Sequence, residues 1–112
     1  MAVKPAGTTL ELRVYQALLK LGWRQQDIEI QTPILGGRSK RGGQVLDFVV
    51  YRPSPLPIEA NGDYWHRDEE REYLATVEAF AAYGVYPVII WGSEATTPDE
   101  TYQVVLNRVG RP

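Results

Sequence analysis

The fold of this protein is decided by residues 44–62, which read QVLDFVVYRPSPLPIEANG. Residues 44–51 are rich in Val and carry apolar side chains at both parities, a pattern typical of a central strand covered on both faces. A proline-rich turn follows at residues 52–55, and residues 56–60 form the next strand. The stretch therefore predicts two adjacent strands of a hairpin, with Asp47 as a charged residue inside the first strand.

Upstream of this stretch the sequence predicts a helix, a short strand and a basic loop. Thr8 is followed three residues later by Glu11, which is the pattern of a capping box, and Gly22 is placed to end the helix in a left-handed conformation. Residues 28–31 read as a short strand. Residues 36–43, GGRSKRGG, are too rich in glycine for regular structure and read as a hairpin tip.

Downstream, residues 67–83 predict an amphipathic helix and residues 85–91 an apolar strand, with a last helix that begins at Thr97 and Pro98. The residues of the first of these helices that are expected to face inward are apolar and helically spaced: Leu74, Val77, Phe80 and Ala81. The order α-β-β-β-α-β-α predicts an α/β fold with a small mixed four-stranded sheet flanked by helices.

Composition limits the class of protein. A length of 112 residues predicts one domain over residues 1–112, and 44% hydrophobic with 23% charged residues is ordinary globular usage. The absence of Cys excludes disulfides and thiolate metal sites. No stretch approaches the roughly 18–20 apolar residues that cross a bilayer, so no membrane partner is expected.

Charge is divided unevenly along the chain. Residues 1–56 carry eight Lys or Arg against four acids, whereas residues 57–112 carry four Arg against ten acids, which together give the net charge of −2. This division suits a protein that contacts a polyanion with one surface and holds cations with another. Chance in a short chain is the alternative.

Two carboxylates are the candidate centre for chemistry. The hairpin places Asp47 beside Glu59, and the alternation of a strand puts Asn61 on the same face as Glu59. Two adjacent acids repel each other unless a cation lies between them, and Mg²⁺ prefers carboxylate and water oxygens. The alternative is structural: Glu59 pairs with Arg41 or Arg52, and Asp47 caps a turn.

Two runs of residues carry a resemblance to a known family, VLDFVV at 45–50 and PIEANGDYWH at 57–66. They resemble the core of the very short patch repair endonucleases within the PD-(D/E)xK nuclease superfamily, where an Asp-Phe strand leads to an apolar strand ending in an acid, a Gly turn, an aromatic pair and a His. Glu11, Gln31 before Thr-Pro-Ile, and GVYPVIIW at 84–91 extend the resemblance over nearly the whole chain.

The sequence departs from the family at three places. Asn61 stands at the position of the Lys in the (D/E)xK pattern. Tyr73 occupies a position where the family has an acid, although Glu72 is adjacent. The zinc site of the repair enzymes has no counterpart, because this chain contains no Cys and a single His.

The resemblance implies a restriction-endonuclease-like core and a metal-dependent DNA endonuclease or nickase that hydrolyses a phosphodiester bond. Asp47 and Glu59 would bind Mg²⁺, for which Mn²⁺ would substitute. His66 would move protons, because its ordinary pKa near 6.5 suits that work. Glu11 and Asn61 would complete the shell around the metal.

DNA is the expected partner. Arg38, Lys40 and Arg41 on the basic loop are placed to follow a phosphate backbone, and the resemblance adds Gln31 to the DNA-binding residues. The expected location is the cytoplasm, in association with the nucleoid. The alternative for the basic run is a solvated loop.

Other readings of the same residues stay open. A catalytically silent DNA-binding or assembly module with this fold would explain the missing lysine. A homodimer or larger complex is a third alternative, because 112 residues leave little surface for reading a DNA sequence. His66 has a structural alternative in which it packs beside Trp65.

Overall fold

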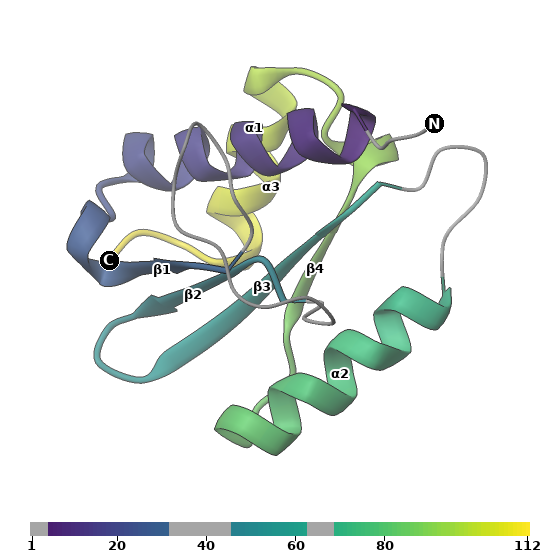
Figure 1. Ribbon diagram of the computed structural model, residues 1–112. Coiled ribbons are helices and arrows are strands. Elements are labelled where there is room, and N and C mark those ends of the chain that lie inside the picture. Colours follow the sequence, from purple (N-terminus) through teal and green to yellow (C-terminus); the bar gives the residue numbers. More distant parts are fainter. Residues whose placement is uncertain (1–4, 32–45, 63–68) are drawn as a thin grey trace.

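The computed structural model describes residues 5–31, 46–62 and 69–112 of the chain (Figure 1). His66 and the basic loop with Arg38, Lys40 and Arg41 lie outside the described residues. The helices and strands follow the expected order, with two short 3-10 turns in addition. Their bounds are α1 Pro5–Leu21, η1 Gln25–Asp27, β1 Ile28–Ile30, β2 Phe48–Tyr51, β3 Pro55–Asn61, α2 Glu69–Tyr83, β4 Val88–Trp91, η2 Gly92–Glu94 and α3 Pro98–Arg108.

The four strands form one mixed sheet in the order β1-β2-β3-β4. β1 pairs with β2, and β2 with β3, in antiparallel fashion, whereas β3 and β4 are parallel. The hairpin of β2 and β3 is therefore the centre of the sheet. The prediction of an α/β fold with a small mixed four-stranded sheet flanked by helices is confirmed.

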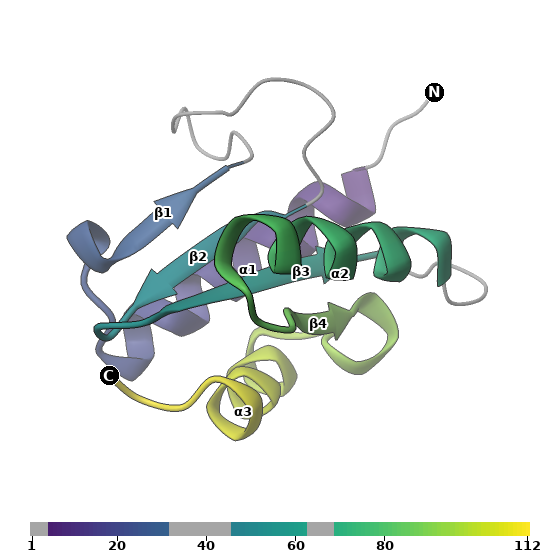
Figure 2. The same cartoon turned by 90° about the horizontal axis from the view of Figure 1, so that it is seen from below.

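The helices lie in two layers, with α1 and α3 on one face of the sheet and α2 on the other (Figures 1 and 2). The main core forms between α1, α3 and the alternate strand residues Phe48, Val50, Ile58 and Ala60. The ring of Tyr15 stacks on that of Phe48 with 6.2 Å between centroids. A smaller apolar cluster lies between the sheet and α2, so each face of the sheet has its own packing.

The start of α1 differs from the prediction. The helix begins at Pro5, so Thr8 and Glu11 lie inside it and do not form a capping box at its start. Proline is compatible with the first helical turn, where its missing N–H would have no partner, and this lets the helix start earlier. The predicted end is confirmed, because Gly22 has a φ of 109°.

The face that α2 turns toward the sheet also differs from the prediction. Leu74, Val77 and Phe80 are 40%, 47% and 45% exposed, and Ala81 is exposed as well. The buried residues are instead small ones that pack with Leu46: Ala75 and Ala79. Small side chains allow the helix to lie close to the sheet, and the large apolar residues are then rotated outward.

No helix in the described part of the chain is long and apolar enough to cross a membrane.

Candidate functional site

The predicted neighbours Asp47 and Glu59 lie side by side. Phe48 pairs with Ile58 in the β2–β3 register, Oδ2 of Asp47 accepts from the N–H of Ala60 beside Glu59, and the two carboxyl groups interact electrostatically. Both side chains are on the face covered by α2, since Phe48 and Ile58 belong to the opposite face. Asp47 is 2% exposed and Glu59 is fully buried.

Asp47 lies directly before β2, although the sequence analysis placed it within the strand. Its Oδ2 accepts a hydrogen bond of 2.7 Å from the N–H of Ala60, and its backbone carbonyl accepts one of 2.8 Å from the N–H of Gln31. The carboxylate thus takes the place of a backbone acceptor opposite Ala60, which is why the regular strand starts one residue later. This bond joins the Asp47 carboxyl group to a strand N–H.

Glu59 is held by a residue that the sequence analysis did not single out. Nη2 and Nε of Arg71 contact its Oε2 at 2.5 and 3.2 Å. Its other oxygen, Oε1, is buried and has no hydrogen-bond partner among the described residues. Arg71 therefore fixes the carboxyl group by one oxygen and leaves the second available to a ligand.

The structural alternative predicted that Glu59 pairs with an arginine. Glu59 does so, but its partner is Arg71. The expected arginines were Arg41, which lies outside the described residues, and Arg52, which is exposed in the turn before β3. A usable signal did exist, because Arg71 is the sole basic residue in the acidic sequence of α2. A lone arginine on a helix that packs across a buried acid is a candidate partner for that acid.

The electrostatics of the pair follow from its burial. Burial and, after it, the nearby Asp47 carboxylate raise the pKa of Glu59, the guanidinium of Arg71 lowers it, and together these effects leave it at about 9. The two carboxyl groups therefore interact directly, and with a pKa of about 9 Glu59 keeps its proton at neutral pH.

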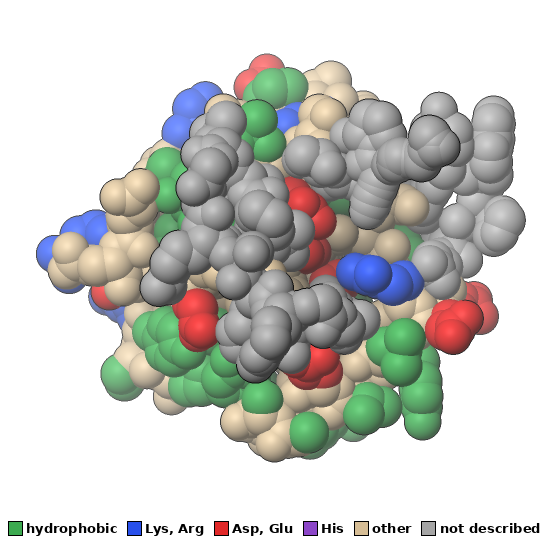
Figure 3. Space-filling view, in the orientation of Figure 1, with side chains coloured by type: hydrophobic (Ala, Val, Ile, Leu, Met, Phe, Trp, Pro, Cys, Tyr) green, Lys and Arg blue, Asp and Glu red, His purple; other side chains and the backbone are tan. Residues whose placement is uncertain are grey.

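The predicted site residues that the structure describes are all buried. The buried polar or charged residues in the described part of the chain are Glu11, Gln31, Asp47, Glu59, Asn61 and Thr101. All but Thr101 were singled out from the sequence. Asn61 ends β3 on the same face as Glu59, and Figure 3 shows acidic side chains gathered near the middle of one side of the molecule, with a basic side chain beside them.

Glu11 does not join the two acids in a larger group. It lies on α1, whose apolar residues cover the opposite face of the sheet. Among the described residues there is no group of three or more His, Cys, Asp or Glu that could hold a metal ion. The acids that the structure brings together are therefore Asp47 and Glu59, without Glu11.

The comparisons with known proteins do not place this chain. No family model, curated protein or solved structure matches it. The chemistry of the site is therefore argued from its own geometry.

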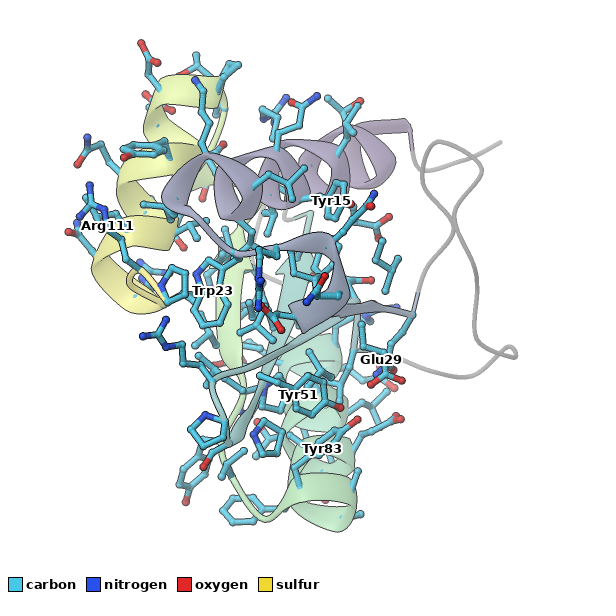
Figure 4. The ribbon with its side chains drawn as sticks, turned by 90° about the vertical axis from the view of Figure 1, so that its left-hand side faces the viewer. Tyr15, Trp23, Glu29, Tyr51, Tyr83 and Arg111 are labelled. Atoms are coloured by element: carbon cyan, nitrogen blue, oxygen red, sulfur yellow. The ribbon has the colours of Figure 1, made fainter. Side chains whose placement is uncertain are left out.

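A second polar group lies on the same face of the sheet. The hydroxyl of Tyr51 donates to Oε1 of Glu29 at 2.8 Å, and the side chains of Tyr51 and Tyr83 are hydrogen-bonded as well (Figure 4). Burial, followed by these hydrogen bonds, raises the pKa of Tyr51 above its usual range. The group connects β1, β2 and the end of α2, whereas Arg71 connects the start of α2 to β3. Together the two contacts hold α2 against the sheet.

The residues of the carboxyl pair fit a divalent cation. The two carboxyl groups offer the oxygen donors that Mg²⁺ and Mn²⁺ prefer. The buried, unpartnered Oε1 of Glu59 is the direct sign of an unfilled requirement, because buried acceptors normally have a partner.

Proposed function

We propose that this protein is a metal-dependent DNA endonuclease or nickase that hydrolyses a phosphodiester bond, built on a restriction-endonuclease-like core. The observation that carries the proposal is the juxtaposition of Asp47 and Glu59 on neighbouring strands, with one oxygen of Glu59 buried and unpartnered. A pair of buried acids destabilises a fold by mutual repulsion and desolvation. A cation site is a reason to keep both.

The chain's own residues prepare the site for Mg²⁺ or Mn²⁺. Ala60 fixes the Asp47 carboxyl through its backbone N–H, and Arg71 fixes the Glu59 carboxyl through Oε2. Such outer contacts orient ligands and are worth about 10–100-fold in metal affinity. When bound, a divalent metal lowers the pKa of a coordinated water and stabilises the charge that develops on phosphate oxygens.

A proton must leave the pair when the site is loaded. Glu59 keeps its proton near neutral pH, since its pKa is about 9, whereas a metal ligand must be ionised. Loading therefore releases about one proton, and metal affinity should rise with pH up to about 9. In the proposed reaction His66 transfers protons, and Arg38, Lys40 and Arg41 bind the DNA backbone.

The alternative is a catalytically silent DNA-binding or assembly module. One observation favours it: the guanidinium of Arg71 already contacts the buried Glu59 carboxyl group. In this alternative the acid and the arginine form a structural ion pair. Both candidates keep DNA as the partner, and they differ in whether metal drives cleavage.

The deciding experiment is incubation of the protein with supercoiled plasmid and Mg²⁺ or Mn²⁺, with EDTA as the control. We expect metal-dependent nicked or linear product, and a loss on the order of 100-fold or more in rate for Asp47→Asn, because the variant lacks a ligand charge. Asp99→Asn, an exposed aspartate in the first turn of α3, is the matched control and should cleave normally. Plasmid that binds but stays intact with either metal would establish the silent module instead.

A further inference from the structure

We propose that Gln31 supplies the third protein oxygen of the cation site, through its side-chain Oε1. This inference rests on the proposed metal site at Asp47 and Glu59. It moves Gln31 from the DNA-contacting role implied by the resemblance to a role in holding the metal.

The three residues form a row across three neighbouring strands. The N–H of Gln31 donates to the carbonyl of Asp47 at 2.8 Å. The carboxyl group of Asp47 accepts from the N–H of Ala60, the residue after Glu59, at 2.7 Å and interacts with the Glu59 carboxyl group. The first bond continues the pairing of β1 with β2 by one residue beyond Ile30 and Phe48. Gln31, Asp47 and Glu59 are therefore consecutive cross-strand neighbours.

All three side chains belong to the face that α2 covers. Ile30, Phe48 and Ile58 precede or follow them by one residue and pack in the core on the opposite face. Side chains alternate along strands, so the row is turned away from that core. Gln and Glu are each one methylene longer than Asp. With strands about 4.8 Å apart, a Gln and a Glu flanking an Asp can bring their oxygens together above it.

The residues at the two ends of the row, Gln31 and Glu59, each have a buried oxygen without a hydrogen-bond partner within the described part of the chain. Oε1 of Gln31 and Oε1 of Glu59 are both buried, and neither has a hydrogen-bond partner among the described residues. Gln31 is 4% exposed and Glu59 is fully buried. A buried acceptor without a partner costs about 1–3 kcal/mol. One cation bound above Asp47 would provide a partner for both of these oxygens.

A divalent cation fits this requirement better than a bridging water. Both unpartnered atoms are oxygen acceptors on residues that flank Asp47. A ligand between them must therefore be a hydrogen-bond donor or a cation. A water could donate to both oxygens, but it supplies no positive charge to the buried Asp47 carboxylate that lies between them. A cation satisfies the oxygens and offsets the charge, and amide carbonyl oxygens are established ligands of hard cations.

The test measures Mn²⁺ affinity by calorimetry at pH 8, together with the rise in melting temperature that Mn²⁺ causes relative to EDTA. Gln31→Met keeps the length of the side chain and removes the oxygen, so we expect at least about a 10-fold weaker Kd and a smaller rise. Gln31→Glu adds a charged oxygen and should bind several-fold more tightly. Gln26→Met, an exposed glutamine two residues before β1, is the matched control and should behave as the wild type.

The outcomes separate this inference from the proposed function. An unchanged Mn²⁺ affinity in Gln31→Met, with Asp47→Asn still abolishing binding, would overturn the role of Gln31 and leave the metal site intact. Weaker DNA binding of that variant in EDTA would then return Gln31 to a DNA contact. If wild-type protein binds no Mn²⁺, the proposed metal site fails and the inference fails with it. Should Gln31→Met not fold, Gln31→Glu decides, because affinity that is not tighter contradicts a ligand at this position.

Discussion

The two faces of the sheet carry different kinds of side chain. The face under α1 and α3 is an apolar core in which Phe48, Val50 and Ile58 are fully buried. The face under α2 combines a small apolar cluster with two polar groups, the carboxyl pair held by Arg71 and the hydrogen-bonded Glu29, Tyr51 and Tyr83. Asp47 and Phe48 are adjacent in sequence and belong to opposite faces.

This difference shows how a short chain can hold buried acids. Apolar burial contributes about 25 cal/mol per Å², so a single large core supplies most of the stability of a small domain. The second face can then carry groups that are costly to bury. The polar contacts at both ends of α2 hold that helix in place with few apolar side chains. The large apolar core and the candidate metal site therefore lie on opposite faces of the same sheet.

The sharpest test of this division uses the two phenylalanines of the chain. Phe48→Ala removes a fully buried ring that stacks on Tyr15, and we expect a loss of about 3–5 kcal/mol in the free energy of unfolding. Phe80→Ala removes a ring on α2 that is 45% exposed and packs edge-on against Tyr86, which should cost about 1 kcal/mol. Urea denaturation of both variants measures the difference. Similar losses would mean that α2 contributes to the main core.

The carboxyl pair should make stability depend on pH. Glu59 has a folded-state pKa of about 9 against an ordinary 4.5, so the folded protein keeps a proton that the unfolded chain releases. Folding therefore takes up a proton between about pH 4.5 and 9, and the stability of metal-free protein should fall as pH rises through this range.

Glu59→Gln should remove this slope, because an amide does not titrate, and should make the protein more stable than wild type near pH 8. Glu78→Gln, also on α2, is the control and should keep the slope of the wild type. Denaturation in EDTA at pH 5, 7 and 9 measures both. A wild-type stability that rises between pH 5 and 9 would show that Glu59 is ionised in the folded protein.

Arg71 should contribute more to stability than an exposed arginine. Arg71→Met leaves Oε2 of the buried Glu59 without its donor, which should cost about 1–3 kcal/mol at pH 7. Arg24→Met breaks an exposed ion pair with Asp27 and should cost less than about 1 kcal/mol. Equal effects in thermal or urea unfolding would mean that Arg71 is not coupled to the buried acid.

The last comparison concerns the face that α2 turns toward the sheet. Ala79→Leu forces a larger side chain into the cluster with Leu46, at a cost of about 1–3 kcal/mol. Val77→Ala shortens a residue that is 47% exposed and should change stability by no more than about 0.5 kcal/mol. The opposite ranking in unfolding experiments would restore the helix face that the sequence favours.

Sequence patterns were sufficient wherever the decisive contacts are local or between paired strands. The apolar run interrupted by Asp47, the proline-rich turn and the second strand predicted the central hairpin, and the hairpin brought Asp47 and Glu59 together. Strand alternation also placed Asn61 on the face of Glu59. These inferences hold because a tight connection and a period of two leave few possible registers.

Helices gave weaker information. In α2, apolar residues occur on two faces of the helix, with Leu74, Val77 and Phe80 on one and Ala75 and Ala79 on the other. The larger side chains of the first face led the sequence pattern to predict that this face is buried. In the structure the second face is buried, because its small side chains let the helix lie close to the sheet. The start of α1 was missed for a related reason, because the pattern of Thr8 and Glu11 is also compatible with the interior of a helix.

By itself, the sequence determined the order of the elements, the central hairpin and the neighbouring positions of two acids, since each depends on short-range alternation and turns. Tertiary structure alone decided that Arg71 pairs with Glu59 and that Gln31 lies beside Asp47 on the neighbouring strand. The physical reason is that such contacts depend on how a helix is rotated and docked on the sheet and on which strands become neighbours. Those properties are set by packing across the whole molecule and leave little trace in local sequence.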